Sequence, residues 1–179
     1  MSIPFLIFSC SRCLYQQNSL NFFGRCLWVH NGQMFQFERE LGLCQNCEGI
    51  VVMEKFPHLN EVERARNLHP KLSGKWINPI NGDNVELMAC QKGFAVLEAV
   101  MAKQRCPVCL KCAQTQVQPL SLSQNSNLKG PLQTGFTHPA CGGDIMVKGS
   151  GGLRVSVREK TFYFDINGRL ITILDGLHL

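Results

Sequence analysis

The feature that most constrains this chain is a set of cysteine pairs whose members are separated by two residues. Cys10 and Cys13 form one pair, and Cys44 and Cys47 form another after thirty intervening residues. A two-residue gap lets one tight turn present two sulfur atoms to a single ion, and two such turns complete a tetrahedral zinc site. The spacing therefore predicts that these four thiols bind one zinc ion.

A second set of paired ligands repeats this plan. The stretch "CPVCLKC" begins with Cys106 and Cys109, and "HPACGG" places His138 and Cys141 at the same gap after 28 intervening residues. A proline follows the first member of each pair and fixes φ at the same internal position of both turns. Imidazole is an accepted zinc ligand. We therefore expect a second zinc ion, bound by three cysteines and one histidine.

Three alternatives remain open for these residues. Free cysteine packs like a small apolar side chain, although the repeated spacing favours metal binding. In the second set Cys112 offers a further thiol that could replace His138 as the fourth ligand. In the first set four thiolates also suit a rubredoxin-like iron centre, so the metal there could be iron instead of zinc.

The paired turns resemble the zinc knuckles of zinc-ribbon domains, in which each knuckle caps a β-hairpin. The resemblance covers residues 3–56 and 104–150 and concerns a widespread structural class, with no particular family indicated. It implies a ligand set in which every position of the first ribbon matches and His138 stands where cysteine is commoner in the second. The implied ligands are Cys10, Cys13, Cys44 and Cys47 in the first ribbon, and Cys106, Cys109, His138 and Cys141 in the second.

The apolar pattern predicts strands around both sets of ligands. "PFLIFSC" leads into the first turn and "GIVVMEKF" leads out of the second, while Asn31-Gly32 is typical of a hairpin turn. "QPLSLSQNSNLKGPLQTG" is polar and indicates a long flexible connection. Near the C-terminus, "LRVSVR", "FYFDI" and "RLITIL" predict a three-stranded β-meander, with Asn167-Gly168 as its last turn.

The segment between the two sets has helical features. Asn60 is a candidate N-cap of a short helix that His69-Pro70 would end. From Asp83 or Asn84 onward, apolar residues recur at gaps of 3 and 4 toward the "CPVCLKC" turn and predict one amphipathic helix, weakened by Gly93.

Together these patterns predict an α+β, metal-stabilised fold in three consecutive parts. Residues 1–56 would form the first zinc ribbon, residues 57–104 a helical connection, and residues 105–179 the second zinc ribbon with the C-terminal β-meander. Segments of about fifty residues bury little apolar surface, so each ribbon is expected to depend on its ion.

Composition and motifs bear on function and partner. The formal net charge is +5, but a four-thiolate zinc site adds −2 and a three-thiolate site with neutral histidine adds −1, which leaves 5 − 3 = +2. Arg154, Arg158 and Tyr163 could share one face of the terminal sheet and contact nucleic acid. With no basic block in the chain, a protein complex is the expected partner and nucleic acid is the second candidate.

The chain carries none of the common signatures of zinc proteases, serine hydrolases, phosphate-binding loops or dinucleotide-binding folds. No apolar run near the N-terminus is long enough for a membrane span and no basic segment precedes one, so we expect a cytoplasmic protein. We predict a non-catalytic, zinc-binding interaction protein. An electron carrier, or an enzyme using Cys112 or an open second site, are the alternatives.

Overall fold

The computed structural model describes residues 2–19, 24–78, 81–121, 130–154 and 160–175. Within these ranges the chain forms six strands, then three helices, then five strands, which confirms an α+β fold. The strands are β1 (Ser2–Cys10), β2 (Gln16–Asn18), β3 (Arg25–His30), β4 (Gln33–Gln36), β5 (Arg39–Cys44), β6 (Gly49–Glu54), β7 (Val117–Pro119), β8 (Leu132–Thr137), β9 (Asp144–Arg154), β10 (Lys160–Phe164) and β11 (Leu170–Asp175). The helices are α1 (Leu59–Leu72), α2 (Asn84–Cys90) and α3 (Phe94–Ala102).

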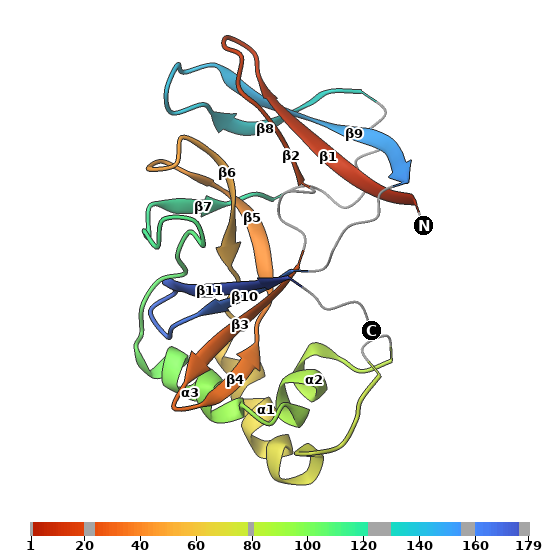
Figure 1. Cartoon of the computed structure of the whole chain (residues 1–179), viewed down its shortest axis with the longest axis vertical. Helices are drawn as coiled ribbons and strands as arrows, with labels where there is room; N and C mark the ends of the chain where they lie inside the picture. The colour runs from red at the N-terminus through yellow and green to blue at the C-terminus, as the bar shows by residue number, and fades with distance from the viewer. Residues whose placement is uncertain (1, 20–23, 79–80, 122–129, 155–159, 176–179) are drawn as a thin grey trace.

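The described strands form three sheets, which follow one another along the long axis of the molecule, with the helices at one end (Figure 1). Sheet A has the order β2-β1-β9-β8, sheet C has the order β6-β5-β7, and sheet B has the order β11-β10-β3-β4. None of the described helices is long and apolar enough to cross a membrane.

Sheet A pairs the N-terminal strand with a strand that follows the helices. Its β1 runs antiparallel to β9 from the Ser2–Arg154 pair to the Cys10–Ile145 pair. Phe8 from β1 and Ile145 from β9 are fully buried in a cluster that also contains Leu43 and Ile50 of sheet C. This apolar contact fixes the register and brings the turn after β1 next to the turn before β9.

Sheet C joins the first set of ligands to the segment that follows the helices. The hairpin of β5 and β6 pairs Cys44 with Gly49, and the opposite edge of β5 pairs Cys44 with Val117 of β7. An isolated bridge also connects Met53 of β6 to Cys109. The turn between β5 and β6 is therefore held beside the "CPVCLKC" segment.

Sheet B contains the predicted hairpin at Asn31-Gly32. Both residues have positive φ, 49° and 73°, and the hairpin pairs His30 with Gln33, which confirms that prediction. In the same sheet β10 pairs with β3 in parallel and with β11 in an antiparallel hairpin. Sheet B thus also combines residues from the beginning and the end of the chain.

The C-terminal strands differ from the predicted β-meander. Of the strand predicted at 153–158, the described residues 153 and 154 are the last residues of β9, in sheet A. Strands β10 and β11 belong instead to sheet B. Residues 155–158 lie outside the described residues, as do residues 122–129 of the polar connection predicted between 118 and 135. The alternating pattern identified strands correctly, but it carries no information on which strands pair.

The helices also depart from the predicted boundaries. Helix α1 begins after His58, whose N–H donates to the Glu61 carboxylate, and continues through Pro70. The expected long helix is split into α2 and α3 before Gly93. A side chain at Gly93 would collide with the Met34 carbonyl oxygen, so the glycine permits a close contact between this break and β4.

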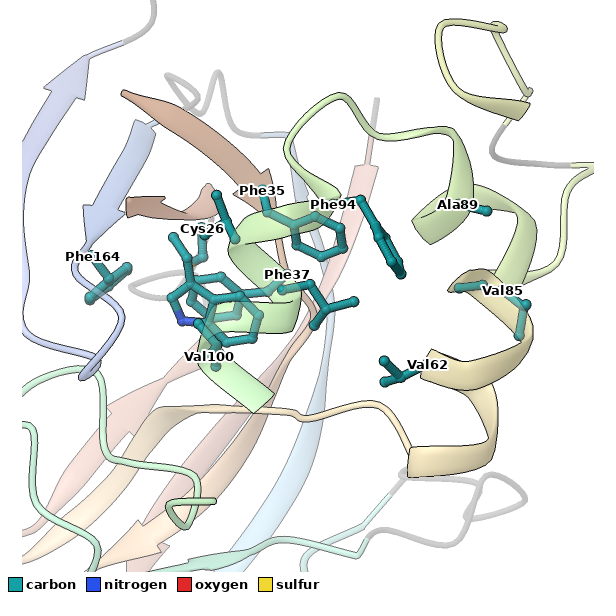
Figure 2. Close-up of a cluster of buried hydrophobic side chains, with 13 residues drawn as sticks. Cys26, Phe35, Phe37, Val62, Val85, Ala89, Phe94, Val100 and Phe164 are labelled. Atoms are coloured by element: carbon teal, nitrogen blue, oxygen red, sulfur yellow. The ribbon is translucent and has the colours of Figure 1, made fainter. Parts of the chain in front are cut away.

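The largest apolar core lies between sheet B and the helices. Trp28 of β3 is fully buried and stacks on Phe37 at a centroid distance of 4.1 Å. Phe35 lies against Phe94 of α3 at a centroid distance of 6.5 Å, and Figure 2 shows α1 and α2, with Val62, Val85 and Ala89, on the far side of the cluster. The helices therefore cover sheet B.

Candidate metal centres

Four potential ligands come together at the junction of β1 and β9. We call Cys10, Cys13, His138 and Cys141 the mixed-ligand group. The Sγ atoms of Cys10 and Cys141 are 3.3 Å apart, and His138 Nδ1 lies 3.5 Å from Cys13 Sγ and 3.3 Å from Cys141 Sγ. All four ligand atoms lie within 4.8 Å of one another.

Four thiols form a second group between β5, β6 and the segment after α3. We call Cys44, Cys47, Cys109 and Cys112 the four-thiol group. The Sγ atoms of Cys44 and Cys112 are 3.7 Å apart, and those of Cys47 and Cys109 are 3.8 Å apart. Sulfurs at the corners of a tetrahedron with zinc–sulfur bonds of about 2.3 Å are separated by about 3.8 Å. The four-thiol group therefore has the spacing of a tetrahedral metal site.

Most of the ligands lie in tight turns that present their sulfurs to one point. Three of the four pairs lie in turns between paired strands, namely β1–β2, β5–β6 and β8–β9. Backbone N–H groups point at the sulfurs: Arg12 N lies 3.4 Å from Cys10 Sγ, and Lys111 N lies 3.4 Å from Cys109 Sγ. A side chain at Gly143 would lie 2.6 Å from Cys10 Sγ, so a glycine is required where the two turns meet.

The pairing of the turns differs from the sequence prediction. Cys10 and Cys13 were expected to share an ion with Cys44 and Cys47, but the structure places them with His138 and Cys141. The antiparallel pairing of β1 with β9 causes this exchange, because it brings Cys10 beside Ile145. Each candidate site therefore joins one turn from before the helices to one turn from after them.

The structure also brings together a different set of thiols in "CPVCLKC". Cys106 is exposed and lies outside both groups, whereas Cys112, considered in the sequence only as a substitute for His138 or a reactive thiol, belongs to the four-thiol group. The sequence contains a signal that could have identified Cys112, because Cys109 and Cys112 are also separated by two residues. The bridge from Met53 to Cys109 brings the later pair to the site. The other seven predicted ligands all belong to one of the two groups.

His138 connects the two groups. Its Nδ1 faces the other ligands of the mixed-ligand group, while its Nε2 lies 2.9 Å from the backbone carbonyl oxygen of Glu48, which follows Cys47 of the four-thiol group. Nε2–H donates to this carbonyl, and a hydrogen bond of this kind fixes the tautomer in which Nδ1 is free to bind metal. A contact with the turn of one site thus orients a ligand of the other.

Tyr15 forms a second connection between the groups. Its ring lies 4.7 Å from the His138 ring, and its hydroxyl accepts a hydrogen bond of 2.7 Å from the N–H of Ile50, just after the turn between β5 and β6. Burial raises the pKa of Tyr15, so the hydroxyl stays protonated and donates to Gln17 Oε1 at 2.9 Å. Neither Tyr15 nor the Glu48 carbonyl was identified from sequence.

The pKa values of the thiols in the four-thiol group are shifted in opposite directions. Burial raises the pKa of Cys109, and it is also the main cause that raises the pKa of Cys47 to about 11. Burial acts in the same direction on Cys112, but hydrogen bonds from the Gln114 backbone and from neighbouring thiols outweigh it and lower the pKa to about 7. Four thiols this close cannot all ionise without a cation, and a divalent ion would remove that restriction.

The thiol pKa values of the mixed-ligand group are also shifted in opposite directions. Burial alone would raise the pKa of Cys10, but hydrogen bonds from the backbone of Arg12 and from the Cys141 thiol lower it to about 7. At Cys141 the Gly143 backbone N–H favours the thiolate, but the hydrogen bond with Cys10 and burial prevail and raise the pKa. Each group therefore contains at least one thiol that is readily ionised near neutral pH.

The donor atoms indicate the metal. Thiolates and imidazole in tetrahedral arrangement are the ligands of structural zinc, so the two groups suggest two zinc-binding sites within β-rich regions. Each group supplies four protein ligands, the number that structural zinc sites use.

Cys90 and Cys26 also lie outside the two groups. Cys90 donates to the Leu87 carbonyl oxygen at 3.1 Å at the end of α2. Cys26 is buried in sheet B, where burial is the main cause that raises its pKa, and its sulfur lies 3.6 Å from Arg39 Nη1. Cys26 and Arg39 line a pocket of about 310 Å³ beside Cys47.

Comparisons with protein-family models, with curated proteins and with solved structures found no match to this chain.

Proposed function

We propose that the chain is a zinc-stabilised, non-catalytic interaction protein whose two metal sites are of the zinc-ribbon knuckle type and which docks on another protein. The observation that carries this proposal is that both groups have four protein ligands. Catalytic zinc normally keeps one coordination position for water or substrate. Closed sites favour a structural role, in which metal holds a binding surface in shape.

The position of Cys112 argues against a thiol-dependent enzyme. Its low pKa would suit a nucleophile, but its sulfur lies 3.7 Å from Cys44 Sγ inside the four-thiol group. A metal-bound thiolate is not free to attack a substrate. The open second site that a zinc enzyme would need is also disfavoured, because His138 completes the mixed-ligand group.

The charge and fold favour a protein partner over nucleic acid. With two zinc ions bound, the formal charge falls from +5 to about +2, which leaves weak attraction to phosphate. Of the residues expected to share a basic face, Arg154 lies in sheet A and Tyr163 lies in sheet B, while Arg158 is outside the described residues. Free thiolate ligands require a reducing compartment, which supports a cytoplasmic location.

A rubredoxin-like iron centre is the second candidate, and one observation favours it. The four-thiol group contains four cysteines and no histidine, and four thiolates in a tetrahedral arrangement suit iron as well as zinc. The mixed-ligand group does not consist of four thiolates, because it contains His138. This histidine is hydrogen-bonded to the Glu48 carbonyl beside the other site. Zinc in both sites accounts for the two groups with one metal.

The test combines metal identity with access to the metal. The protein purified under reducing conditions should be colourless and contain two zinc ions, whereas iron would make it red. After replacement of zinc by Co²⁺, the absorption spectrum should be that of tetrahedral cobalt and should not change when azide is added. A spectrum that shifts with azide would reveal an open position and would contradict the non-catalytic proposal.

The docking part of the proposal needs a separate measurement. We expect the zinc-loaded chain to retain a protein partner during affinity purification after nuclease treatment, and to release it when the zinc is chelated. Retention of RNA or DNA alone, with loss of all bound material after nuclease treatment, would instead support nucleic-acid binding and contradict a protein partner.

A further inference from the structure

We propose that the two candidate metal sites are thermodynamically coupled, so that zinc bound at the four-thiol group strengthens zinc binding at the mixed-ligand group, and the reverse. The connection consists of two side chains, His138 and Tyr15, that both reach from the mixed-ligand group to residues 48–50, directly after Cys47. The proposal rests on zinc binding at both groups, which the proposed function also requires, but it concerns how the two affinities depend on each other.

The conformation of residues 48–50 depends on the turn of the four-thiol group. Cys44 precedes this turn and Cys47 lies within it, and Glu48 closes it with a positive φ of 51° and an N–H that donates to the Gln45 carbonyl oxygen at 3.3 Å. A residue other than glycine keeps such a φ only where the surrounding structure imposes it. Binding of one ion by Cys44 and Cys47 closes this turn and thereby sets the direction of the Glu48 carbonyl.

His138 is the first side chain that depends on this segment. Its Nε2 donates to the Glu48 carbonyl oxygen at 2.9 Å, while its Nδ1 faces Cys13 and Cys141. His138 is only 5% exposed, so without this carbonyl the Nε2–H would lose its acceptor in a place with little access to water. Hydrogen-bond partners of this kind orient a ligating histidine, and their loss typically weakens metal binding by about 10- to 100-fold.

Tyr15 is the second side chain, and it comes from the other half of the mixed-ligand group. Its carbonyl oxygen accepts a hydrogen bond of 3.1 Å from the Cys10 N–H, so its backbone belongs to the turn that carries Cys10 and Cys13. Its hydroxyl accepts from the Ile50 N–H at 2.7 Å, and a Cβ at Gly49 would lie 2.7 Å from the hydroxyl oxygen. Both turns of the mixed-ligand group therefore contact the same three residues of the other site's turn.

Coupling follows because both sites depend on the order of residues 48–50. When the four-thiol group is empty, an ion that binds the mixed-ligand group must also order this segment, which lowers its affinity. When the four-thiol group is filled, the segment is already ordered and the other ion binds to a prepared His138. Coupling between two binding sites is reciprocal, so each ion raises the affinity for the other by the same factor.

The two groups differ in their exposure. Cys44 and Cys109 of the four-thiol group are fully buried, whereas Cys13 of the mixed-ligand group is exposed and Cys10 and Cys141 are partly exposed. A chelator therefore reaches the ion of the mixed-ligand group first. The coupling makes that ion harder to remove as long as the buried group stays filled.

The experiment compares the full chain with two single-site variants in competition titrations with a chromophoric zinc chelator under reducing conditions. Cys112→Ser breaks the four-thiol group and reports on the mixed-ligand group alone, and Cys13→Ser does the reverse. For independent sites, the overall association constant for two ions in the wild-type chain would equal the product of the two single-site constants. We expect it to exceed that product by about tenfold or more. Equality would overturn the coupling, while two closed zinc sites, and with them the proposed function, would stand.

Tyr15→Phe tests the connection itself, because it removes one hydroxyl and keeps all eight ligands of the two groups. The matched control is Tyr163→Phe, which removes the other tyrosine hydroxyl of the chain, in sheet B. The overall constant for two ions should fall by about fivefold or more in Tyr15→Phe and stay unchanged in Tyr163→Phe. In the Cys112→Ser background, Tyr15→Phe should leave the affinity of the mixed-ligand group unchanged.

This background separates a connection between the sites from local packing. An equal fall in affinity when Tyr15→Phe is added to Cys112→Ser would assign Tyr15 a role within its own site and would overturn the proposal. If a single-site variant fails to fold, the full chain still decides the question. Equal overall constants for the Tyr15→Phe and wild-type chains would then overturn the coupling.

Discussion

Removing both metal ions should unfold most of the protein under reducing conditions. Each candidate site joins turns that are far apart in sequence: Cys10 and Cys141 are separated by 131 residues, and Cys44 and Cys112 by 68. Structural zinc contributes about 10 to 16 kcal/mol of apparent binding free energy in small peptides, which is comparable to the total stability of a typical domain, about 5 to 15 kcal/mol.

Without the ions, the same groups lose the bonds that join their turns. Cys44 and Cys109 are fully buried, and because four thiols this close cannot all ionise without a cation, neutral thiols remain that do not hold the two turns together. The effect should extend beyond the sites, because sheets A and C share one apolar cluster between them.

The measurement is circular dichroism and tryptophan fluorescence during titration with a zinc chelator. Trp28 reports on the core between sheet B and the helices, since its ring is fully buried there. We expect loss of strand signal, exposure of Trp28 and recovery after zinc is restored, while a chelator selective for calcium serves as the control. An unchanged melting temperature after complete removal of both ions would contradict the structural role of the metal.

Replacing Glu54 by alanine should be the most destabilising substitution away from the metal ligands. Glu54 is fully buried at the end of β6, where Arg105 donates to both carboxylate oxygens, with a distance of 2.7 Å from Nη2 to Oε1. Trp28 Nε1 also donates to Oε1 at 2.8 Å, and the N–H of Val108 donates to Oε2 at 3.1 Å. One carboxylate thus connects β6, the core tryptophan and the segment that enters the four-thiol group.

Loss of this carboxylate leaves all these donors without their partner. Removing one member of a buried ion pair typically costs about 3 to 5 kcal/mol, because the other charge remains buried. Urea denaturation of the zinc-loaded Glu54→Ala variant should measure this loss in the free energy of unfolding. The matched control is Glu38→Ala, since Glu38 pairs with Lys55 at 2.7 Å but both side chains are about half exposed.

The exposed pair should contribute no more than about 1 kcal/mol. If Glu54→Ala cost as little as Glu38→Ala, the contribution assigned to the Glu54 network would be wrong. Glu54 and Arg105 were not recognised from sequence, because no local pattern distinguishes a buried carboxylate from one at the surface.

The sequence predicted local features well. The hairpin at Asn31-Gly32, the strands on either side of the ligands and the helical central segment all occur, because these depend on turn chemistry and on the periodicity of apolar residues. Seven predicted ligands also lie in the two groups, because the two-residue spacing is a property of one turn.

The arrangement of those features in space could not be predicted in the same way. Pairing of β1 with β9 is decided by apolar contacts such as Phe8 with Ile145, between residues separated by most of the chain. The sequence interpretation joined turns that are neighbours along the chain, and the structure joins turns that become neighbours only after the sheets form. The choice of Cys112 over Cys106 likewise follows from a long-range contact, the bridge between Met53 and Cys109.

The measurement that tests this account most directly is the metal content of two cysteine variants by native mass spectrometry. Cys106→Ser should retain two zinc ions, because Cys106 is exposed and lies outside both groups, whereas Cys112→Ser should retain only one tightly bound ion. If Cys112→Ser fails to fold, Cys106→Ser still decides the question. Loss of an ion from Cys106→Ser, or two tightly bound ions in Cys112→Ser, would contradict this pairing of the turns.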